Sequence, residues 1–290
     1  MRLWGLFKGK GGNLGVEELA KRLGMDVATF RGVRPSYKEF TIPKRSGGTR
    51  TISVPSQELK AVQKRILRRL FQRLKAHPTV TGFERGHSIV TNALCHVGKA
   101  VVVRMDIKDF FASTSAKRVD AYFRTIGWDS EAAGLLGQLC THRGGLPQGA
   151  PTSPRIANVV NYRMDARLAG LATKQGAAYT RYADDLTFSF ENDDATAVRR
   201  VVRTAKLILK DEGYEVHHRK KLQVRRRHQR QTVTGLVVNQ VASLPRKTRR
   251  WLRAVDRHLV TGQTASLTPQ QRAGWRAFEA MIEHQRETQS

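Results

Sequence analysis

The sequence predicts an α+β fold in which helices back an antiparallel sheet. Two short apolar runs, at residues 177–181 and 186–190, flank a polar turn and predict a β-hairpin. A longer apolar run at 100–107 predicts a buried strand. Amphipathic stretches separate these strands along the chain. The resulting order of strand, helix, hairpin, helix and strand favours a single sheet covered by helices.

The N-terminal part of the chain predicts helices around one hairpin. Residues 16–31 predict two short helices in a helix-turn-helix pattern, which has low specificity for any function. Residues 38–54 predict two strands joined by a glycine-containing turn. Residues 56–76 predict a basic amphipathic helix that ends before Pro78. Ser88 is expected to cap a further helix that reaches about residue 97.

The remaining elements follow the same reasoning. Ser153 and Pro154 favour a helix start, because serine caps free N–H groups and proline lacks only an N–H that would be unpaired there. Gly213 is expected to end another helix. The complete set comprises helices at 115–125, 130–140, 153–171, 194–212, 246–260 and 269–285, a Gly/Pro loop at 144–150, and strands at 222–226 and 232–238.

The charge of the chain indicates a polyanionic partner. Its 290 residues include 52 Lys and Arg against 24 Asp and Glu, a net charge of +28. A surface evolved for solubility or an anionic membrane would be the alternatives. Between Arg219 and Arg257, however, 13 basic residues accompany one acid, Asp256. This concentration favours nucleic acid.

The cysteines and the hydrophobic pattern bear on the cellular compartment. Cys95 and Cys140 provide neither a disulfide framework nor zinc-ligand spacing, so both are expected to be small buried residues in a reducing cytosol. The apolar run in the first ten residues is too short for a signal peptide, and no stretch is long enough to span a membrane. The sequence therefore predicts a soluble cytoplasmic protein with no membrane partner.

Three aspartates predict a metal site. Asp184 and Asp185 lie in the hairpin turn, where adjacent carboxylates repel each other unless a cation is bound. Asp106 ends the buried strand and would lie beside them if that strand pairs with the hairpin. Two-metal phosphoryl transfer uses carboxylates that hold two divalent ions roughly 3.5–4 Å apart. Taken singly, each acid is also consistent with an ordinary turn or strand end.

The blocks around these acids resemble those of reverse transcriptases. Residues 104–111 (RMDIKDFF) resemble the first catalytic block, 145–154 (GLPQGAPTSP) the nucleotide-binding loop and helix, and 182–185 (YADD) the second acid block. Residues 92–96 (NALCH) and 233–235 (VTG) are similar to elements of the retron branch of this family. The resemblance covers roughly residues 37–239, with the blocks in the family's order.

The resemblance implies a right-hand polymerase with fingers, an antiparallel-sheet palm and a helical basic thumb. The domains implied are an N-terminal helical extension at 1–36, fingers and palm at 37–240, and the thumb at 241–290.

The resemblance also implies a catalytic centre. Asp106, Asp184, Asp185 and Lys220 would be catalytic, with Lys220 protonating the leaving pyrophosphate. Two Mg²⁺ ions, with Mn²⁺ as a possible substitute, would be bound at Asp106, Ile107, Asp184 and Asp185. Adjacent strand residues point to opposite faces, so Asp185 is expected to contact metal less directly than Asp184. His217 departs from the family, in which retron enzymes often have Asn.

The nucleotide-binding residues implied are Lys44, Arg50, Phe111, Gln148 and Gly149. Phe111 would exclude a ribose 2′-hydroxyl and so favour dNTPs, although a core Phe is the alternative; Phe110 is the expected core residue of the pair. Arg50 suits bidentate contact with phosphate. Without the rest of the pattern, Lys44 and Arg50 would be interpreted as solvated charges on an exposed hairpin.

The RNA-binding residues implied are basic residues near and within the thumb. Trp251 could stack on a base or belong to the core. Asn92 and His96 are expected on one helix face, where scaffolding and RNA positioning both remain open. The basic set comprises Arg225, Arg226, Arg227, Arg246, Lys247, Arg249, Arg250 and Arg253.

The activity implied is that of a retron-type RNA-directed DNA polymerase, a nucleotidyltransferase. It would use dNTPs to copy part of its cognate structured noncoding RNA into single-stranded DNA branched from a guanosine 2′-hydroxyl (msDNA). A separate effector protein and a role in defence against phage are implied as well. The alternatives are a reverse transcriptase of another lineage, such as an intron-type or other defence enzyme, and a noncatalytic RNA-binding protein that keeps the palm.

Overall fold

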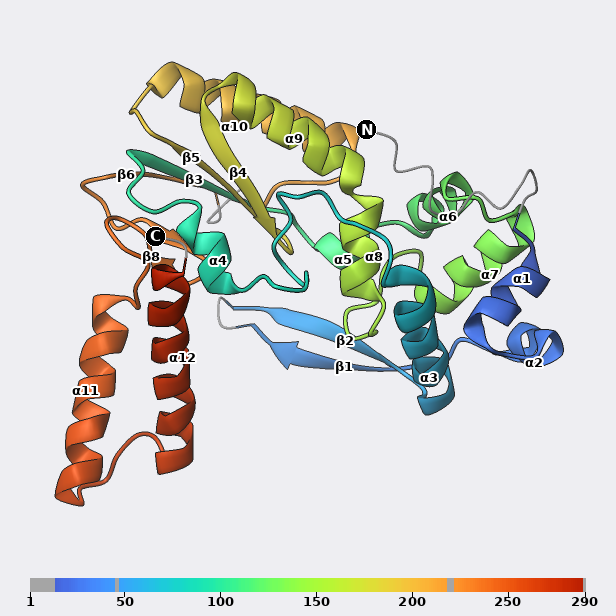
Figure 1. Cartoon of the computed structure of the whole chain (residues 1–290), viewed down its shortest axis with the longest axis horizontal. Coiled ribbons are helices and arrows are strands. Elements are labelled where there is room, and N and C mark those ends of the chain that lie inside the picture. Colours follow the sequence, from blue (N-terminus) through green and yellow to red (C-terminus); the bar gives the residue numbers. More distant parts are fainter. Residues whose placement is uncertain (1–13, 45–46, 218–221, 289–290) are drawn as a thin grey trace. The chain divides into compact units, whose positions relative to one another are not determined.

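The computed structural model describes residues 14–44, 47–217 and 222–288 (Figure 1). The chain divides into two compact units. Unit 1 comprises Met1–His77, Lys108–Met164 and Lys210–Tyr214. Unit 2 comprises Pro78–Ile107, Asp165–Leu209 and Glu215–Ser290. Both units are discontinuous in sequence, because the chain passes between them several times.

Unit 1 is mostly helical, with one antiparallel strand pair. Its core is apolar: Leu19, Leu59 and Leu136 are fully buried, and the Phe71 and Phe123 rings stack with centroids 5.9 Å apart. The elements are α1 (Val16–Leu23), α2 (Val27–Gly32), β1 (Tyr37–Pro43), β2 (Thr49–Pro55), α3 (Gln57–Ile66), the π-helical turn η2 (Leu67–Phe71), α5 (Phe110–Ser113), α6 (Ala116–Thr125), α7 (Ser130–Cys140) and α8 (Ser153–Val160).

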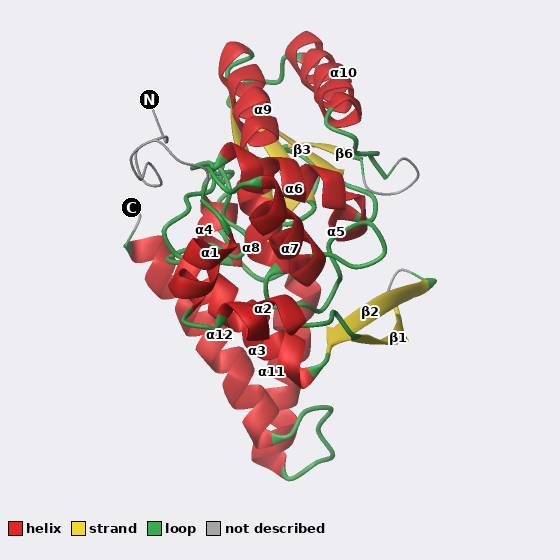
Figure 2. Ribbon diagram, turned by 90° about the vertical axis from the view of Figure 1, so that its right-hand side faces the viewer, coloured by secondary structure: helices red, strands yellow, loops and turns green. Residues whose placement is uncertain are grey.

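Unit 2 is built on a four-stranded antiparallel sheet in the order β4-β5-β3-β6. Helices α9 and α10 cover one face of this sheet (Figures 1 and 2). The elements assigned wholly or mainly to unit 2 are α4 (Ile89–Leu94), β3 (Val101–Asp106), α9 (Tyr162–Lys174), β4 (Ala177–Tyr182), β5 (Asp185–Phe190), α10 (Ala195–Asp211), β6 (Gln223–Arg226), β7 (Thr232–Val233), β8 (Leu236–Val237), α11 (Arg246–Thr261) and α12 (Pro269–Glu287).

Strand β3 is one of the two inner strands of the sheet, and most of its side chains are apolar on both faces. Val101, Val102, Val103 and Met105 are each at most 1% exposed. A continuous apolar run of this kind is typical of a strand covered on both sides. The strand pairs with β5 along its whole length, from Val101 opposite Phe190 to Asp106 opposite Asp185.

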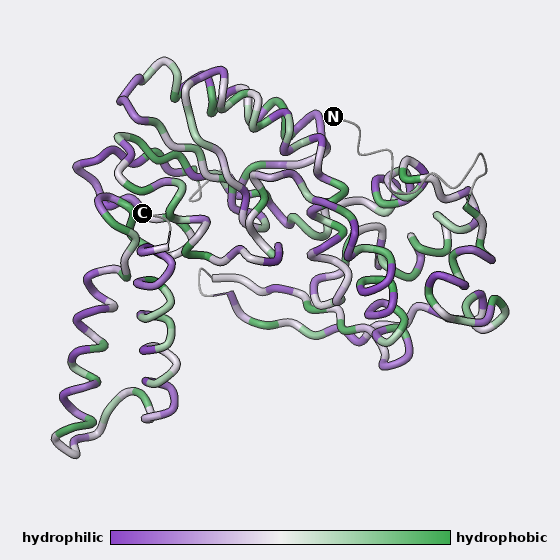
Figure 3. Tube along the Cα trace, in the orientation of Figure 1, coloured by the Kyte–Doolittle hydropathy of each residue, from purple (hydrophilic) through white to green (hydrophobic). Residues whose placement is uncertain are grey.

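A second core joins α4, β3, the β7–β8 hairpin and the two C-terminal helices. Val90, Val102, Leu236, Leu252 and Ile282 are among its buried members. Helix α11 contributes a narrow apolar stripe and is otherwise hydrophilic (Figure 3). This core therefore fixes one face of α11 and leaves its basic face exposed.

The predicted mixture of helices and an antiparallel sheet is confirmed, and four boundaries were wrong. The helix expected to reach about residue 97 ends at Leu94. The helix expected at 56–76 ends in a π-helical turn at Phe71. The helix expected at 153–171 breaks at Asn161, whose Nδ2 donates to the Ala157 carbonyl and whose Oδ1 accepts from the Tyr214 hydroxyl. The strand expected at 232–238 is a hairpin, because Thr234 and Gly235 have φ of 45° and 89°.

Two further features differ from the sequence-based expectation. Cys140 is buried as expected, but Cys95 is exposed. The one-turn helix α5 was not predicted, because four residues are too few to show helical periodicity. Within the described residues, no helix combines the length and hydropathy needed to cross a bilayer.

Candidate active site

The three predicted metal-binding aspartates lie at one end of the unit 2 sheet. Asp106 is the last residue of β3 and is 6% exposed. Its register partner is Asp185, the first residue of β5. The Ile107 N–H donates to the Asp184 carbonyl at 3.0 Å, so the backbone holds the turn against the end of β3. Asp106, Asp184 and Asp185 are thus brought together by strand pairing between distant parts of the sequence.

The turn between β4 and β5 is held by a buried ion pair. Arg181 and Asp165 are both fully buried and form two parallel bonds of 2.8 Å, from Nε to Oδ1 and from Nη2 to Oδ2. The Tyr179 hydroxyl also donates to Asp165, and burial raises the pKa of Tyr179 well above its usual value. Arg181 Nη1 donates to the Ala183 carbonyl at 3.1 Å. Ala183 has a φ of 57°, a conformation unusual for alanine, and Arg181 stabilises it directly.

The segment before α4 lies along the outer edge of β4 and contacts the same turn. The Arg181 N–H donates to the Thr79 carbonyl, and the Thr81 N–H donates to the Arg181 carbonyl. A Cβ at Gly82 would come within 2.6 Å of the Ala183 nitrogen, which is closer than atoms can approach. Only glycine therefore fits at position 82.

Asn92 and His96 belong to the scaffold of this hairpin. Both are buried. Asn92 accepts a hydrogen bond from the Thr81 hydroxyl, while the two ring nitrogens of His96 lie 2.7 Å from the hydroxyls of Ser189 on β5 and Thr180 on β4. Burial, followed by the charge of Lys99, lowers the pKa of His96 to about 3, so the ring is neutral at physiological pH. These contacts tie the element at 92–96 to the strands that carry the acids.

The carboxylate oxygens of Asp106, Asp184 and Asp185 are chemically suited to bind a hard divalent cation. Carboxylate oxygens are the ligands that Mg²⁺ prefers, and it needs only one or two from protein when substrate phosphates supply others. In the described part of the chain, however, no three His, Cys, Asp or Glu side chains are gathered in the arrangement of a metal site. Arg104 Nη2 lies 3.2 Å from Asp185 Oδ1 and offsets part of its charge. The backbone thus gathers the acids, while the side chains are not arranged as a closed metal cage.

The predicted nucleotide-binding residues all lie in unit 1. Arg50 is exposed on β2, where it lies opposite Ile42 of β1. The Lys44 N–H donates to the Gly48 carbonyl in the turn of the same hairpin. The loop at 145–150 packs against the same strand, because the Ser53 N–H donates to the Gln148 carbonyl at 2.9 Å.

Gly149 lies in the loop at 145–150, and Phe111 lies on α5, which contacts that loop. Gly149 has a φ of 128°, and a Cβ there would meet the Ser53 carbonyl oxygen at 2.9 Å. The Leu146 N–H donates to the Phe111 carbonyl, which joins α5 to the loop. Phe111 is half-buried and Phe110 is buried, so the expected core residue of the pair is confirmed. Lys220 lies outside the described residues.

The predicted RNA-binding residues form exposed basic surfaces in unit 2. Arg226 pairs with Asp193 at 2.7 Å, while Arg225 and Arg227 on either side are exposed. Trp251 is partly exposed, and its ring lies edge-on to that of Trp275 with centroids 5.8 Å apart, so it belongs to the packing between α11 and α12. The exposed residues on α11 are Arg246, Lys247, Arg249, Arg250 and Arg253.

A buried arginine organises the two C-terminal helices. Arg272 is 6% exposed and bonds Asp256 and Glu279, and the Arg272 and Arg276 guanidinium groups lower the pKa of Asp256. A cavity of about 300 Å³ beside it is lined by Arg246, Arg249 and Arg253. Asp256 is therefore paired with Arg272 and Arg276, and Glu279 with Arg272. The α11 arginines that line the cavity are themselves exposed.

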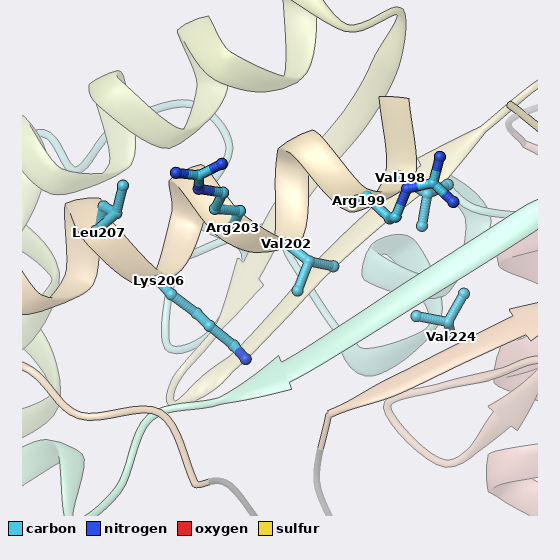
Figure 4. A pocket seen from close by; sticks show the side chains of 7 residues that line it. All are labelled: Val198, Arg199, Val202, Arg203, Lys206, Leu207 and Val224. Carbon is cyan, nitrogen blue, oxygen red and sulfur yellow. The ribbon is translucent and has the colours of Figure 1, made fainter. Parts of the chain in front are cut away.

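A shallow groove runs along α10 and reaches β6. It has a volume of about 460 Å³ and is lined by Val198, Arg199, Val202, Arg203, Lys206 and Leu207 of α10 and by Val224 of β6 (Figure 4). Leu207, at its end, is 58% exposed. Among the residues that the structure describes, no predicted catalytic, nucleotide-binding or RNA-binding residue lines it.

Sequence reasoning missed four residues that hold the acid turn: Thr81, Gly82, Asp165 and Arg181. Arg181 directly precedes Tyr182, and a charged residue in an otherwise apolar strand signals a buried partner. Asp165 gives a matching signal on a helix. Pairing one with the other requires the fold, because nothing in the sequence specifies that α9 lies over β4.

Comparison with known proteins agrees with this arrangement. The family model described as reverse transcriptase (RNA-dependent DNA polymerase) matches residues 42–251. The chain is 42% identical over 265 residues to the retron Mx65 reverse transcriptase of Myxococcus xanthus, covering 82% of this chain but only 61% of that protein. It is 34% identical to the retron Ec86 reverse transcriptase of Escherichia coli, covering 93% of this chain and 81% of that one.

Among solved structures, the fold is similar to that of a telomerase from Candida albicans, solved with a fragment of telomeric RNA. The TM-score is 0.50 at 14% sequence identity, covering 80% of this chain and 51% of the telomerase. At this identity the similarity concerns the fold alone, and that fold is a right-hand polymerase.

Proposed function

Because the chain belongs to the reverse transcriptase family, we propose that it is an RNA-directed DNA polymerase of retron type. The observation that carries the proposal is the register of β3 and β5, which pairs Asp106 with Asp185 and holds Asp184 beside them. A protein that only binds RNA has no need for three acids at one end of a sheet. Such a cluster would instead repel the phosphates of its ligand.

In this proposal, Asp106, Asp184 and Asp185 hold two Mg²⁺ ions, with the backbone at Ile107 part of the same site. When bound, such ions activate the attacking hydroxyl and stabilise the leaving phosphate. Arg181 and Gly82 fix the turn that carries two of the acids. Asp185 forms an ion pair with Arg104, so Asp106 and Asp184 would be the principal metal ligands.

The remaining roles concern substrates. Arg50 and Lys44 would bind the triphosphate, and Gln148 and Gly149 would contact the incoming dNTP. Phe111 would exclude a ribose 2′-hydroxyl, and Lys220 would protonate the pyrophosphate. The basic residues of β6 and α11, with Arg227, would bind the phosphates of a structured RNA, which is recognised largely by shape, phosphate and 2′-hydroxyl contacts.

The proposed product is single-stranded DNA joined to the 2′-hydroxyl of a guanosine in the cognate RNA. The two named relatives are retron enzymes, which supports this form of priming. We further propose that the protein acts in the cytoplasm, together with a separate effector, in defence against phage. Sequencing the nucleic acid that copurifies with the protein tests the first point: DNA joined to RNA by a debranching-sensitive bond is expected. A product without that bond would instead indicate a reverse transcriptase of another lineage.

The polymerase assignment is tested by replacing both acids of the turn. Asp184→Ala with Asp185→Ala should abolish metal-dependent dNTP incorporation and leave RNA binding within about twofold. The matched control is Asp193→Ala with Asp194→Ala, a second adjacent acid pair in unit 2. Asp194 caps α10 by accepting from Thr196 and Ala197, so the control should lose about 1 kcal/mol of stability and keep its activity. Equal incorporation by the turn variant and the parent would overturn the assignment.

A further inference from the structure

Phe83 is a large apolar side chain beside the acid turn, and neither the core nor the proposed catalytic set uses it. We propose that Phe83 and Tyr182 form an aromatic platform on which a nucleobase of the bound primer–template stacks. This inference rests on the proposed function, since it concerns the nucleic acid that occupies the same turn.

The position of Phe83 is fixed by its neighbours. Val80 bridges to Arg181, and the Thr81 N–H donates to the Arg181 carbonyl at 3.0 Å. Gly82 packs directly on the backbone of Tyr182 and Ala183. Phe83 therefore follows a segment that is locked to the catalytic hairpin, so its ring stays beside Tyr182 rather than moving with a free loop.

The ring of Phe83 is presented to solvent. It is 49% exposed, and its centroid lies 6.3 Å from that of Tyr182, with an angle of 38° between the planes. Its backbone is left-handed, with φ of 62°, which is uncommon for a bulky residue. Such conformations cluster at ligand-binding sites, where the surrounding structure maintains them. Solvent exposure and an unfavourable backbone together are a poor arrangement for a residue that only packs.

The surroundings of the ring favour a nucleic acid as its ligand. Arg85 and His87, in the same loop, are exposed and can meet phosphates, while Glu84 is half-buried. Aromatic faces with nearby cations are the usual means by which proteins bind nucleic-acid strands without regard to sequence. A polymerase must accept every base at its active site, and stacking satisfies that need because all bases have a π-face.

The test uses the full chain and a synthetic primer–template that contains 2-aminopurine, a base whose fluorescence falls when it stacks. One substrate carries 2-aminopurine at the primer 3′ end, and another carries it at the first template position. The substrate whose fluorescence falls identifies the strand that stacks on Phe83. Phe83→Ala should weaken primer–template binding roughly 5- to 100-fold and restore the fluorescence. Phe83→Trp should keep both binding and quenching, while Phe83→Leu, apolar but not aromatic, should behave like alanine.

All three substitutions keep a side chain at φ of 62°, so backbone strain is common to them. Leu207→Ala is the control for loss of an exposed apolar side chain in unit 2, and should bind like the parent. The proposal is overturned if Phe83→Ala binds and quenches like the parent, or if Phe83→Trp loses as much as Phe83→Ala while its melting temperature is unchanged. The fluorescence is read without dNTPs. Failure of the parent to extend the primer would therefore contradict the polymerase assignment and leave the stacking result interpretable.

Discussion

Replacing Asp165 by Asn removes the charge that balances Arg181 and keeps almost the same side-chain volume. Both residues are fully buried, and Arg181 makes two bonds of 2.8 Å to the carboxylate. The variant would leave a guanidinium charge inside the protein with a neutral partner. We expect a large loss of stability, because an unbalanced buried charge is costly.

The size of the loss follows from the burial of the pair. Removing one partner of a buried ion pair costs about 3–5 kcal/mol, a large share of the roughly 5–15 kcal/mol that stabilises a typical domain. For a unit of roughly 150 residues, this corresponds to a melting temperature lower by about 6–20 °C. An exposed pair in the same unit gives the contrast. Asp193→Asn weakens the pair with Arg226, both of which are about two-fifths exposed, and should cost no more than about 1 kcal/mol.

The assay combines thermal unfolding, followed by circular dichroism, with primer extension well below the melting temperature of each variant. A double variant, Asp165→Leu with Arg181→Met, separates stability from positioning. Replacing a whole buried pair by apolar residues is often neutral, but the buried Tyr179 hydroxyl loses its acceptor, so stability should return only in part. The hydrogen bond from Arg181 to the Ala183 carbonyl is still absent, so extension should stay roughly tenfold below the parent.

Two results would refute this reasoning. If Asp165→Asn lowers the melting temperature no more than Asp193→Asn, the buried charge is not the main cost. If the double variant extends primers at the parental rate, Arg181 does not position the turn.

Three other substitutions test neighbouring features. Phe111→Ala should raise rNTP incorporation relative to dNTP, measured by steady-state extension, because the ring no longer excludes the 2′-hydroxyl. Gly82→Ala should reduce extension at least tenfold, because its Cβ would come within 2.6 Å of the Ala183 nitrogen, whereas Gly170→Ala on α9 meets no atom within 4 Å and should be tolerated. The pKa of His96 is lowered to about 3 in the folded protein, whereas the unfolded chain takes up this proton near pH 6.5. The free energy of unfolding should therefore fall as the pH drops from about 6.5 toward 3. His96→Gln should reduce this pH dependence, measured by urea unfolding.

Each of these has a contrary outcome. Unchanged sugar discrimination would assign Phe111 to packing against Phe110, whose ring lies 5.5 Å away. Normal extension by Gly82→Ala would mean that the segment at 79–82 can move away from the turn. An acid dependence that is unaffected by His96→Gln would place the responsible proton on another group.

The sequence predicted the strands well because their signals are local. The apolar run that became β3 and the two runs flanking the acid turn each match the structure within about two residues. Helix ends were harder, because tertiary contacts override propensity. Asn161 interrupts an apolar pattern that would otherwise continue, since its side chain bonds both Ala157 and the distant Tyr214.

The candidate site was predictable in its acids and not in its supports. Asp106, Asp184 and Asp185 stand out in the sequence as carboxylates at the ends of apolar runs. Their pairing through β3 and β5 followed from the hairpin prediction. The contacts of Asn92 and His96 with Thr81, Thr180 and Ser189 could not be inferred, because no pattern in the sequence specifies how α4 packs against β4 and β5. The exposure of Cys95 likewise depends on how the turn after α4 is oriented.

The position of β3 between β5 and β6 has a consequence for synthesis of the protein on the ribosome. Its partners β5 and β6 are translated roughly 80 and 120 residues later. At translation rates of about 5–20 residues per second, this apolar strand stays unpaired for several seconds before β5 has been made. Nascent chains halted in that interval would expose Val101–Asp106 and be prone to aggregation. The acid pair likewise cannot form until Asp185, the first residue of β5, has been made, roughly 80 residues after Asp106.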